Sequence, residues 1–186
     1  MTALATPSRL RDGEVSLLPV DATVAALLVA ASHDRDITRW TQVPKGMRML
    51  DAGLVVAGWA GTGNVVRLQV RVGDGEPVGM VTVWINSGGE AEVGYWLLKA
   101  ARGRGVARRA VRLLCEWAFT ACEVDLLRLT TLLGNTSSEK VAASCGFRPA
   151  GTRVGDVRGS RQVVRSWVRA RDSAIDSADQ REAMGT

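Results

Sequence analysis

The chain is poor in the residues that build disulfide, metal and histidine-dependent sites. Its 186 residues include three cysteines and one histidine. Cys115, Cys122 and Cys145 are odd in number and form no C-x-x-C pair, so the sequence supports neither a disulfide framework nor a zinc site. His33 lies in no local motif with a serine or cysteine nucleophile, and we expect an ordinary loop residue at that position.

Long apolar runs are also absent. Runs such as residues 52–60 are interrupted by glycine and are much shorter than the roughly 20 residues that a membrane span requires. Residues 1–10 contain no apolar core ahead of their charges, so no secretory signal is visible. We therefore expect a cytoplasmic protein without a membrane partner. Its hydrophobic content of 46% is typical of a soluble domain, and we predict one domain over residues 1–171.

Acidic residues are concentrated at the end of the chain. Residues 172–186 carry four acidic and one basic side chain, a net charge of −3, whereas the whole chain carries +5. The preceding 171 residues therefore hold +8, a balance that suits an anionic ligand. Charge alone does not distinguish a nucleotide cofactor from nucleic acid. The small polar composition of residues 172–186 predicts a disordered tail.

Apolar periodicity predicts an alternation of strands and helices, with a loop over residues 33–44. Three adjacent strands joined by glycine-rich turns predict an antiparallel meander, and the following strand, helix and strand predict a right-handed parallel crossover. Thr136 with Glu139 predicts a capping box, and Gly146 predicts a left-handed helix end. The predicted strands are residues 14–18, 65–72, 78–86, 90–98, 126–133, 147–157 and 162–168, and the predicted helices are residues 22–31, 47–59, 106–121 and 136–145.

The most informative segment is the basic, glycine-interrupted loop at residues 102–105, which connects an apolar strand to an amphipathic helix. The first turn of a helix has up to about four N–H groups without intrahelical partners, at the positive end of the helix macrodipole. Glycines in the loop allow an anion to approach the backbone closely. The segment therefore predicts a binding site for a phosphate group.

The pattern Arg102-Gly103-Arg104-Gly105-Val106-Ala107 resembles the R/Q-x-x-G-x-G/A signature of the GNAT acetyltransferases. The surrounding residues are similar to the RimJ/RimL-like branch, which contains the ribosomal-protein N-acetyltransferases. The likeness covers roughly residues 9–170. The residues that carry the branch resemblance are the segments 92–96, 146–147 and 39–41 together with Pro44, Asn135 and Ser138.

The resemblance implies an α+β (mixed α/β) fold. In this GNAT fold a central, mostly antiparallel twisted sheet of roughly six or seven strands is flanked by about four helices. The parallel fourth and fifth strands splay apart. Lys99 stands where the RimJ/RimL-like branch often has proline, which puts the geometry of the following loop in question.

The resemblance also implies acetyl-CoA as cosubstrate, with no metal. A pyrophosphate lying across the N–H groups of the loop meets both the helix dipole and the donors. Backbone groups freed by the splay are expected to pair with the pantetheine arm, and a side-chain amide is expected to hold the arm from the other side. The implied cofactor-binding residues are Trp96, Leu97, Leu98, Arg102, Gly103, Arg104, Gly105, Val106, Ala107 and Asn135.

The implied reaction is attack of a neutral amine on the thioester carbonyl. Glu92, on the fourth strand of the family fold, is the candidate base, acting through water, and Glu90 on the same face is the substitute. A backbone N–H near Leu97 is the expected oxyanion donor. Many GNAT enzymes carry a tyrosine acid where this chain has Ala142, so Ser138 is our candidate for protonating the leaving thiolate.

The acceptor is less determined than the donor. A protein or peptide N-terminal α-amine is favoured by analogy, and a small amine such as an antibiotic, polyamine or amino acid is the alternative. Trp40 and Trp59 lie near the helices that wall the acceptor site in this family. A non-catalytic acyl-CoA sensor and a nucleic-acid-binding module remain as other function classes, although the tryptophans follow core periodicity better than a base-stacking pattern. Nothing in the sequence decides whether the protein is a homodimer.

Overall fold

The computed structural model describes residues 6–59, 63–86 and 88–171. The strands in these ranges are β1 (Leu10–Asp12), β2 (Val15–Pro19), β3 (Val65–Val72), β4 (Gly79–Ile85), β5 (Glu90–Leu97), β6 (Leu126–Leu132), β7 (Arg148–Val157) and β8 (Ser160–Ala170). The helices are α1 (Thr23–His33), α2 (Arg35–Trp40), α3 (Met49–Gly58), α4 (Val106–Ala121), α5 (Thr136–Ser144) and a short 3-10 turn, η1 (Lys99–Ala101).

The eight described strands form one sheet in the order β1-β2-β3-β4-β5-β6-β8-β7. Neighbouring strands are antiparallel except for β5 and β6, which are parallel and are connected through α4. The predicted mixed α/β fold with a parallel crossover is thus confirmed. The sequence predicted at most seven strands and about four helices. The described residues contain one strand and one α-helix more, because β1 and α2 were not predicted.

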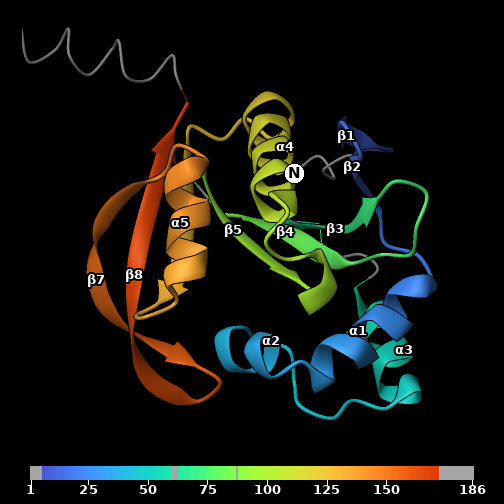
Figure 1. The fold of residues 1–186 in the computed structure, drawn as a ribbon. Coiled ribbons are helices and arrows are strands. Elements are labelled where there is room, and N and C mark those ends of the chain that lie inside the picture. The colour runs from blue at the N-terminus through green and yellow to red at the C-terminus, as the bar shows by residue number, and fades with distance from the viewer. Residues whose placement is uncertain (1–5, 60–62, 87, 172–186) are drawn as a thin grey trace, which may run out of the picture.

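Helices cover both faces of the sheet. Helices α4 and α5 pack on one face, and α1, α2 and α3 lie on the other (Figure 1). Helix α4 is strongly amphipathic: Val111 and Leu114 are fully buried against the sheet, whereas Arg108 and Arg112 are not. Burial of this apolar stripe supplies most of the contact between α4 and the central strands.

Helix α2 lies within the segment predicted as a loop, which corrects that prediction. Asp34 initiates it, because the Asp34 carboxylate accepts hydrogen bonds from the N–H groups of Asp36 and Ile37 at 3.0 and 3.2 Å. Ile37 is buried, so the short helix is anchored to the core as well. A helix of six residues with two apolar side chains, Ile37 and Trp40, has too little periodicity to be recognised in the sequence.

Two further helix predictions are corrected. In α3, the apolar residues Leu50 and Leu54 are 71% and 66% exposed, so the periodicity identified the helix but not its buried face. In α5, the cap is the Asn135 carboxamide, which accepts from the Ser138 N–H, and not the predicted box of Thr136 with Glu139. Gly146 has the predicted left-handed conformation, with φ of 82°.

The parallel strands β5 and β6 separate halfway along their length. Their pairing runs from Glu90 opposite Leu126 to Val93 opposite Leu129. Beyond this point β5 stays paired with β4 as far as Leu97, and β6 stays paired with β8 as far as Leu132. The sheet therefore opens between two intact halves, as the predicted splay requires.

No α-helix in the described ranges is both long enough and apolar enough to cross a membrane. The predicted disordered tail, residues 172–186, lies outside the described residues, and the boundary of a single domain at residue 171 stays a prediction.

The close approach of β4 to β5 at the opening generates a stability prediction. Gly79 lies opposite Leu97, and a Cβ at position 79 would collide with the Trp96 carbonyl oxygen and the Leu97 side chain. We expect Gly79→Ala to lower the free energy of unfolding by about 1–3 kcal/mol, because the backbone must shift. Urea unfolding followed by circular dichroism measures this change.

The matched control is Gly58→Ala in α3, where an added Cβ meets no atom within 4 Å. Alanine is the better helix former, so this variant should gain up to about 1 kcal/mol. Equal stability of the two variants would contradict the proposed collision at position 79.

Candidate functional site

A cleft of about 1160 Å³ passes through the opening between β5 and β6. The known range for small-molecule pockets is about 300–1000 Å³, so this cleft has room for two substrates. Its walls come from both faces of the sheet: the loop before α4 and helix α5 on one side, and α2, α3 and the β7–β8 hairpin on the other. All of the predicted site residues line the cleft except Leu98 and Arg104.

The loop before α4 presents a row of unpaired backbone donors. Within the described chain, no acceptor is found for the N–H groups of residues 103–107. Gly103 and Gly105 have φ of 76° and 75°, and a Cβ at either position would meet no atom within 4 Å. The left-handed conformation favours glycine, and the open space lets an anion reach the N–H groups. These residues fit a pyrophosphate.

The Arg102 guanidinium was predicted to contact the anion. In the structure its hydrogen bonds go to other residues of the chain. Its Nε donates to the Leu97 carbonyl at 2.9 Å, and its two terminal nitrogens donate to Asp34 at 2.7 Å and Asp36 at 2.8 Å. Burial is the largest single influence on the pKa of Asp34 and acts to raise it, but the hydrogen bond and charge of Arg102 and the N–H groups of Ile37 and Asp36 together lower the pKa below its ordinary value. Arg102 therefore fixes the cofactor loop to the start of α2.

The backbone of β5 alternates between β4 and the opening. Leu98 donates its N–H to the Val78 carbonyl at 2.8 Å, and the Leu126 N–H donates to the Gly89 carbonyl at 3.2 Å. The alternation of an antiparallel ladder then turns Trp96 toward β4 and turns Tyr95 and Leu97 toward the opening. The expectation of freed backbone groups is wrong for Trp96 and Leu98. The groups that face the opening belong to Tyr95 and Leu97, and of these the Leu97 carbonyl already accepts from Arg102.

Asn135 lies on the opposite side of the opening, after β6. Its side-chain oxygen accepts from the Ser138 N–H at 3.2 Å and so caps α5. Its side-chain N–H groups have no acceptor in the described part of the chain, although the residue lines the cleft. The capping role therefore leaves the amide donor available to a ligand.

The two candidate carboxylates have different surroundings. Glu90 forms two hydrogen bonds of 2.9 Å with the Arg128 guanidinium, and this contact lowers the pKa of Glu90. Glu92 lines the cleft, half-buried, and makes no hydrogen bond or ion pair with any residue in the described ranges. Glu92 is thus the carboxylate available to a substrate, and Glu90 is occupied in an ion pair.

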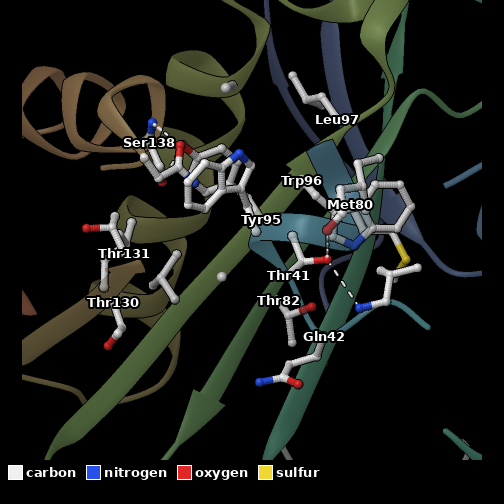
Figure 2. A pocket seen from close by; sticks show the side chains of 18 of the residues that line it. Thr41, Gln42, Met80, Thr82, Tyr95, Trp96, Leu97, Thr130, Thr131 and Ser138 are labelled. Carbon is white, nitrogen blue, oxygen red and sulfur yellow. Dashed lines mark hydrogen bonds between the residues drawn. The ribbon is translucent and has the colours of Figure 1, made fainter. Parts of the chain in front are cut away.

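Tyr95 is a site residue that the sequence reasoning missed. Its hydroxyl donates to the Ser138 hydroxyl at 3.0 Å, and Figure 2 shows the two side chains pointing toward one another beside the opening. Burial raises the pKa of Tyr95 to about 12, so its phenol stays protonated at neutral pH. The sequence did contain a signal for this position. Side chains alternate between the two faces of a strand, so Tyr95, between Gly94 and Trp96, must point to the opposite face from Glu92.

The far side of the cleft is aromatic. Trp40, Trp59 and Trp84 line it, and Trp84 is 38% exposed. The side chain of Trp84 packs over Gly94, where a Cβ would lie 2.8 Å from the indole. At its outer edge, the Arg158 guanidinium at the tip of the β7–β8 hairpin donates to the Val43 carbonyl at 2.7 Å and so bridges the two walls.

Comparison with known proteins gives matches at the levels of family and fold. The family profile described as the acetyltransferase (GNAT) domain matches residues 15–148. The Bacillus subtilis (strain 168) protein named "Putative ribosomal N-acetyltransferase YdaF" is 34% identical over 62 residues, which are 33% of this chain and 34% of that protein. The alignment therefore spans about a third of that relative's length.

Solved structures share the fold over most of the chain. RimL, a ribosomal L7/L12 α-N-protein acetyltransferase in complex with coenzyme A, is 16% identical with a TM-score of 0.78, over 89% of this chain and 99% of its own. Mycobacterium smegmatis RimJ in complex with CoA-disulfide is 24% identical with a TM-score of 0.77, over 89% of this chain and 87% of its own. Vibrio cholerae spermidine N-acetyltransferase in complex with CoA and spermine is 16% identical with a TM-score of 0.76, over 87% of this chain and 98% of its own.

The matched profile covers strands β2 to β6, the loop before α4 and helix α5, and it ends at the start of β7. The likeness to RimL and RimJ is a likeness of fold. The chain belongs to the GNAT family of acetyltransferases.

Proposed function

We propose that this protein transfers an acetyl group from acetyl-CoA to the α-amine at the N-terminus of a peptide or protein, by direct attack in a ternary complex. The observation that carries the proposal is one cleft that joins two unlike sites. The unpaired N–H groups of residues 103–107 lie at one end, and the unengaged Glu92 carboxylate lies beyond the opening in the sheet.

Donor binding rests on backbone groups. The N–H groups of residues 103–107 bind the pyrophosphate, and Arg104, near the loop, adds positive charge. The pantetheine arm passes through the opening, where Tyr95 and Leu97 present backbone groups from β5 and the Asn135 amide faces it from the other side. Carbon–sulfur bond cleavage in the bound thioester supplies the acetyl group.

Glu92 acts as the general base, through an intervening water. An α-amine has a pKa near roughly 8 and a lysine side chain near roughly 10, so an N-terminus needs less help to lose its proton at neutral pH. The Leu97 N–H faces the opening and stabilises the negative charge that develops on the carbonyl oxygen. A base without a competing ion pair, such as Glu92, is free to accept the proton.

The Tyr95–Ser138 pair serves the leaving thiolate. Because the Tyr95 hydroxyl donates to the Ser138 oxygen, the hydrogen of Ser138 is free to point into the cleft. Ser138 then donates to the sulfur as its negative charge develops. Tyr95 polarises Ser138 and takes the place of the tyrosine acid that position 142 lacks.

The charges on the acceptor side favour a single-amine acceptor over a polyamine. A polyamine needs several carboxylates, but Asp36 is engaged by Arg102 and only Glu92 among the lining carboxylates near the opening is unengaged. Arg67 and Arg153 add positive charge to the same walls. The complex of a Vibrio cholerae relative with spermine keeps a small-amine acceptor as the second candidate.

A CoA-release assay over N-terminal peptides, polyamines, aminoglycosides and amino acids tests the proposal. We expect turnover of peptides above the other classes, together with thermal stabilisation by acetyl-CoA. Stabilisation without any turnover would instead identify an acyl-CoA sensor. Turnover confined to small amines would move the acceptor to the second candidate.

The role of Glu92 gives the first prediction from the proposed function. Glu92→Gln removes the base while keeping the shape of the side chain, so kcat/KM at neutral pH should fall by about 10²- to 10⁴-fold. The matched control is Glu90→Gln, two residues away on the same face, which should change kcat/KM by less than about threefold. Steady-state CoA release measures both. Full activity of the Glu92 variant at neutral pH would exclude Glu92 as the base.

The Tyr95–Ser138 pair gives the second prediction. Tyr95→Phe removes one hydrogen bond of about 0.5–1.5 kcal/mol, so kcat should fall up to roughly tenfold. Ser138→Ala should cost at least as much. Because the two groups act as one unit, the double variant should lose no more than Ser138→Ala alone. Strictly additive losses in a double-mutant cycle would show that the two hydroxyls act independently.

Asn135 gives the third prediction, which separates its cap from its amide. Asn135→Asp keeps a strong helix cap but lacks the N–H donor, so the Kd for CoA should rise by roughly tenfold while Tm stays near that of the unmodified protein. Asn135→Ala should lose the cap as well, at about 1 kcal/mol of stability. Calorimetric titration and thermal unfolding distinguish these outcomes. Unchanged CoA affinity in the aspartate variant would leave Asn135 with a purely structural role.

A further inference from the structure

Arg153 is a cation in the wall of the cleft that the β7–β8 hairpin forms, and it has no part in the proposed reaction. It lies on β7 in register with Val164 of β8, which pairs in turn with Leu132 at the end of β6. Side chains in register on adjacent strands share a face of the sheet. Arg153 therefore lies on the acceptor side, in one row with two other residues that line the cleft.

The local sequence directs the Arg153 side chain along the strand. A Cβ at Gly155 would lie 3.3 Å from a terminal nitrogen of Arg153, so the guanidinium lies over the glycine backbone. Gly155 lines the same cleft. Because Gly155 has no side chain, the Arg153 guanidinium has room to lie in the wall of the cleft.

Arg153 has no carboxylate partner in the described ranges. The neighbouring Asp156 also lines the cleft, and one of its carboxylate oxygens accepts a hydrogen bond from the Gly159 N–H at 2.9 Å. Asp36 is held by Arg102, and Glu139 is held by Arg165 at 2.8 Å. Asp36, Asp156 and Glu139 thus each have a partner other than Arg153.

A second arginine adds positive charge at the same edge. Arg158, at the hairpin tip, uses one nitrogen to contact the Val43 carbonyl and forms no ion pair within the described chain. An acceptor that enters here carries a positively charged amine toward Glu92. The two arginines repel that positive charge. Such a wall favours an acceptor that also carries negative charge near the amine.

We propose that the preferred acceptor is a peptide N-terminus with an aspartate or glutamate within its first few residues, and that Arg153 binds this carboxylate. The inference rests on the proposed N-terminal acetyltransferase function and names its substrate class. A guanidinium presents donors in a planar fork that matches both oxygens of a carboxylate. Arg153 is then a residue that determines acceptor specificity.

The test uses the full chain and matched peptides that differ at position 2, 3 or 4 by aspartate, asparagine or lysine. CoA release gives kcat/KM for each peptide. We expect aspartate at one or more positions to exceed asparagine by about ten- to a hundredfold, the range of a charge-assisted contact, and lysine to be the poorest.

Two variants locate the effect. Arg153→Gln should bring the aspartate-to-asparagine ratio close to one, and Arg153→Lys should keep part of it because the charge remains. The control is Arg161→Gln on the same hairpin, an exposed arginine paired in register with Asp156, which should keep the ratio of the unmodified protein. The rise of Tm with CoA verifies that each variant is folded.

The outcomes distinguish the inference from the function on which it rests. Acetylation of peptides with no preference for aspartate, or a preference that survives in Arg153→Gln, overturns the inference and leaves the proposed function intact. Failure to acetylate any peptide in the series overturns both. A preference that Arg153→Gln abolishes and Arg161→Gln retains supports the assignment of Arg153.

Discussion

The separation of two parallel strands is the constraint on which the rest of the structure depends. Pairing between β5 and β6 stops at Val93 and Leu129, so backbone donors and acceptors remain unpaired inside the molecule. Unpaired backbone groups away from water are costly, and something must meet them. Arg102 meets the Leu97 carbonyl, and the remaining groups face the cleft. In the proposed binding mode, the amide groups of the pantetheine arm would pair with these backbone groups.

The Arg102 guanidinium connects three parts of the molecule that are distant in sequence. It bonds the last residue of β5 and two carboxylates at the start of α2, 66 and 68 residues earlier. Its planar fork suits this arrangement, whereas the compact charge of a lysine would reach fewer acceptors. The donor loop and the acceptor helices are therefore held in one arrangement by a single side chain. The arginine of the sequence signature is thus engaged within the chain, and the proposed anion contacts fall to the N–H groups of the loop.

Features that depend on neighbouring residues were predictable from the sequence, and features that depend on distant ones were not. The glycine loop and the amphipathic α4 carry their information within a few turns of chain. The partner of Ser138 could not be found in this way, because Tyr95 lies 43 residues earlier. The same holds for Arg102, since its motif does not reveal Asp34. The candidate base was narrowed from two glutamates to Glu92 only when the structure placed Arg128 beside Glu90.

The bridge between Arg158 and Val43 joins residues 115 positions apart and closes the outer edge of the acceptor cleft into a ring. For the proposed N-terminal acceptor, this contact would favour a chain end. A free terminus would approach the bridge as a single extended segment, whereas an internal lysine on a folded surface would bring the chain on both of its sides to the same place.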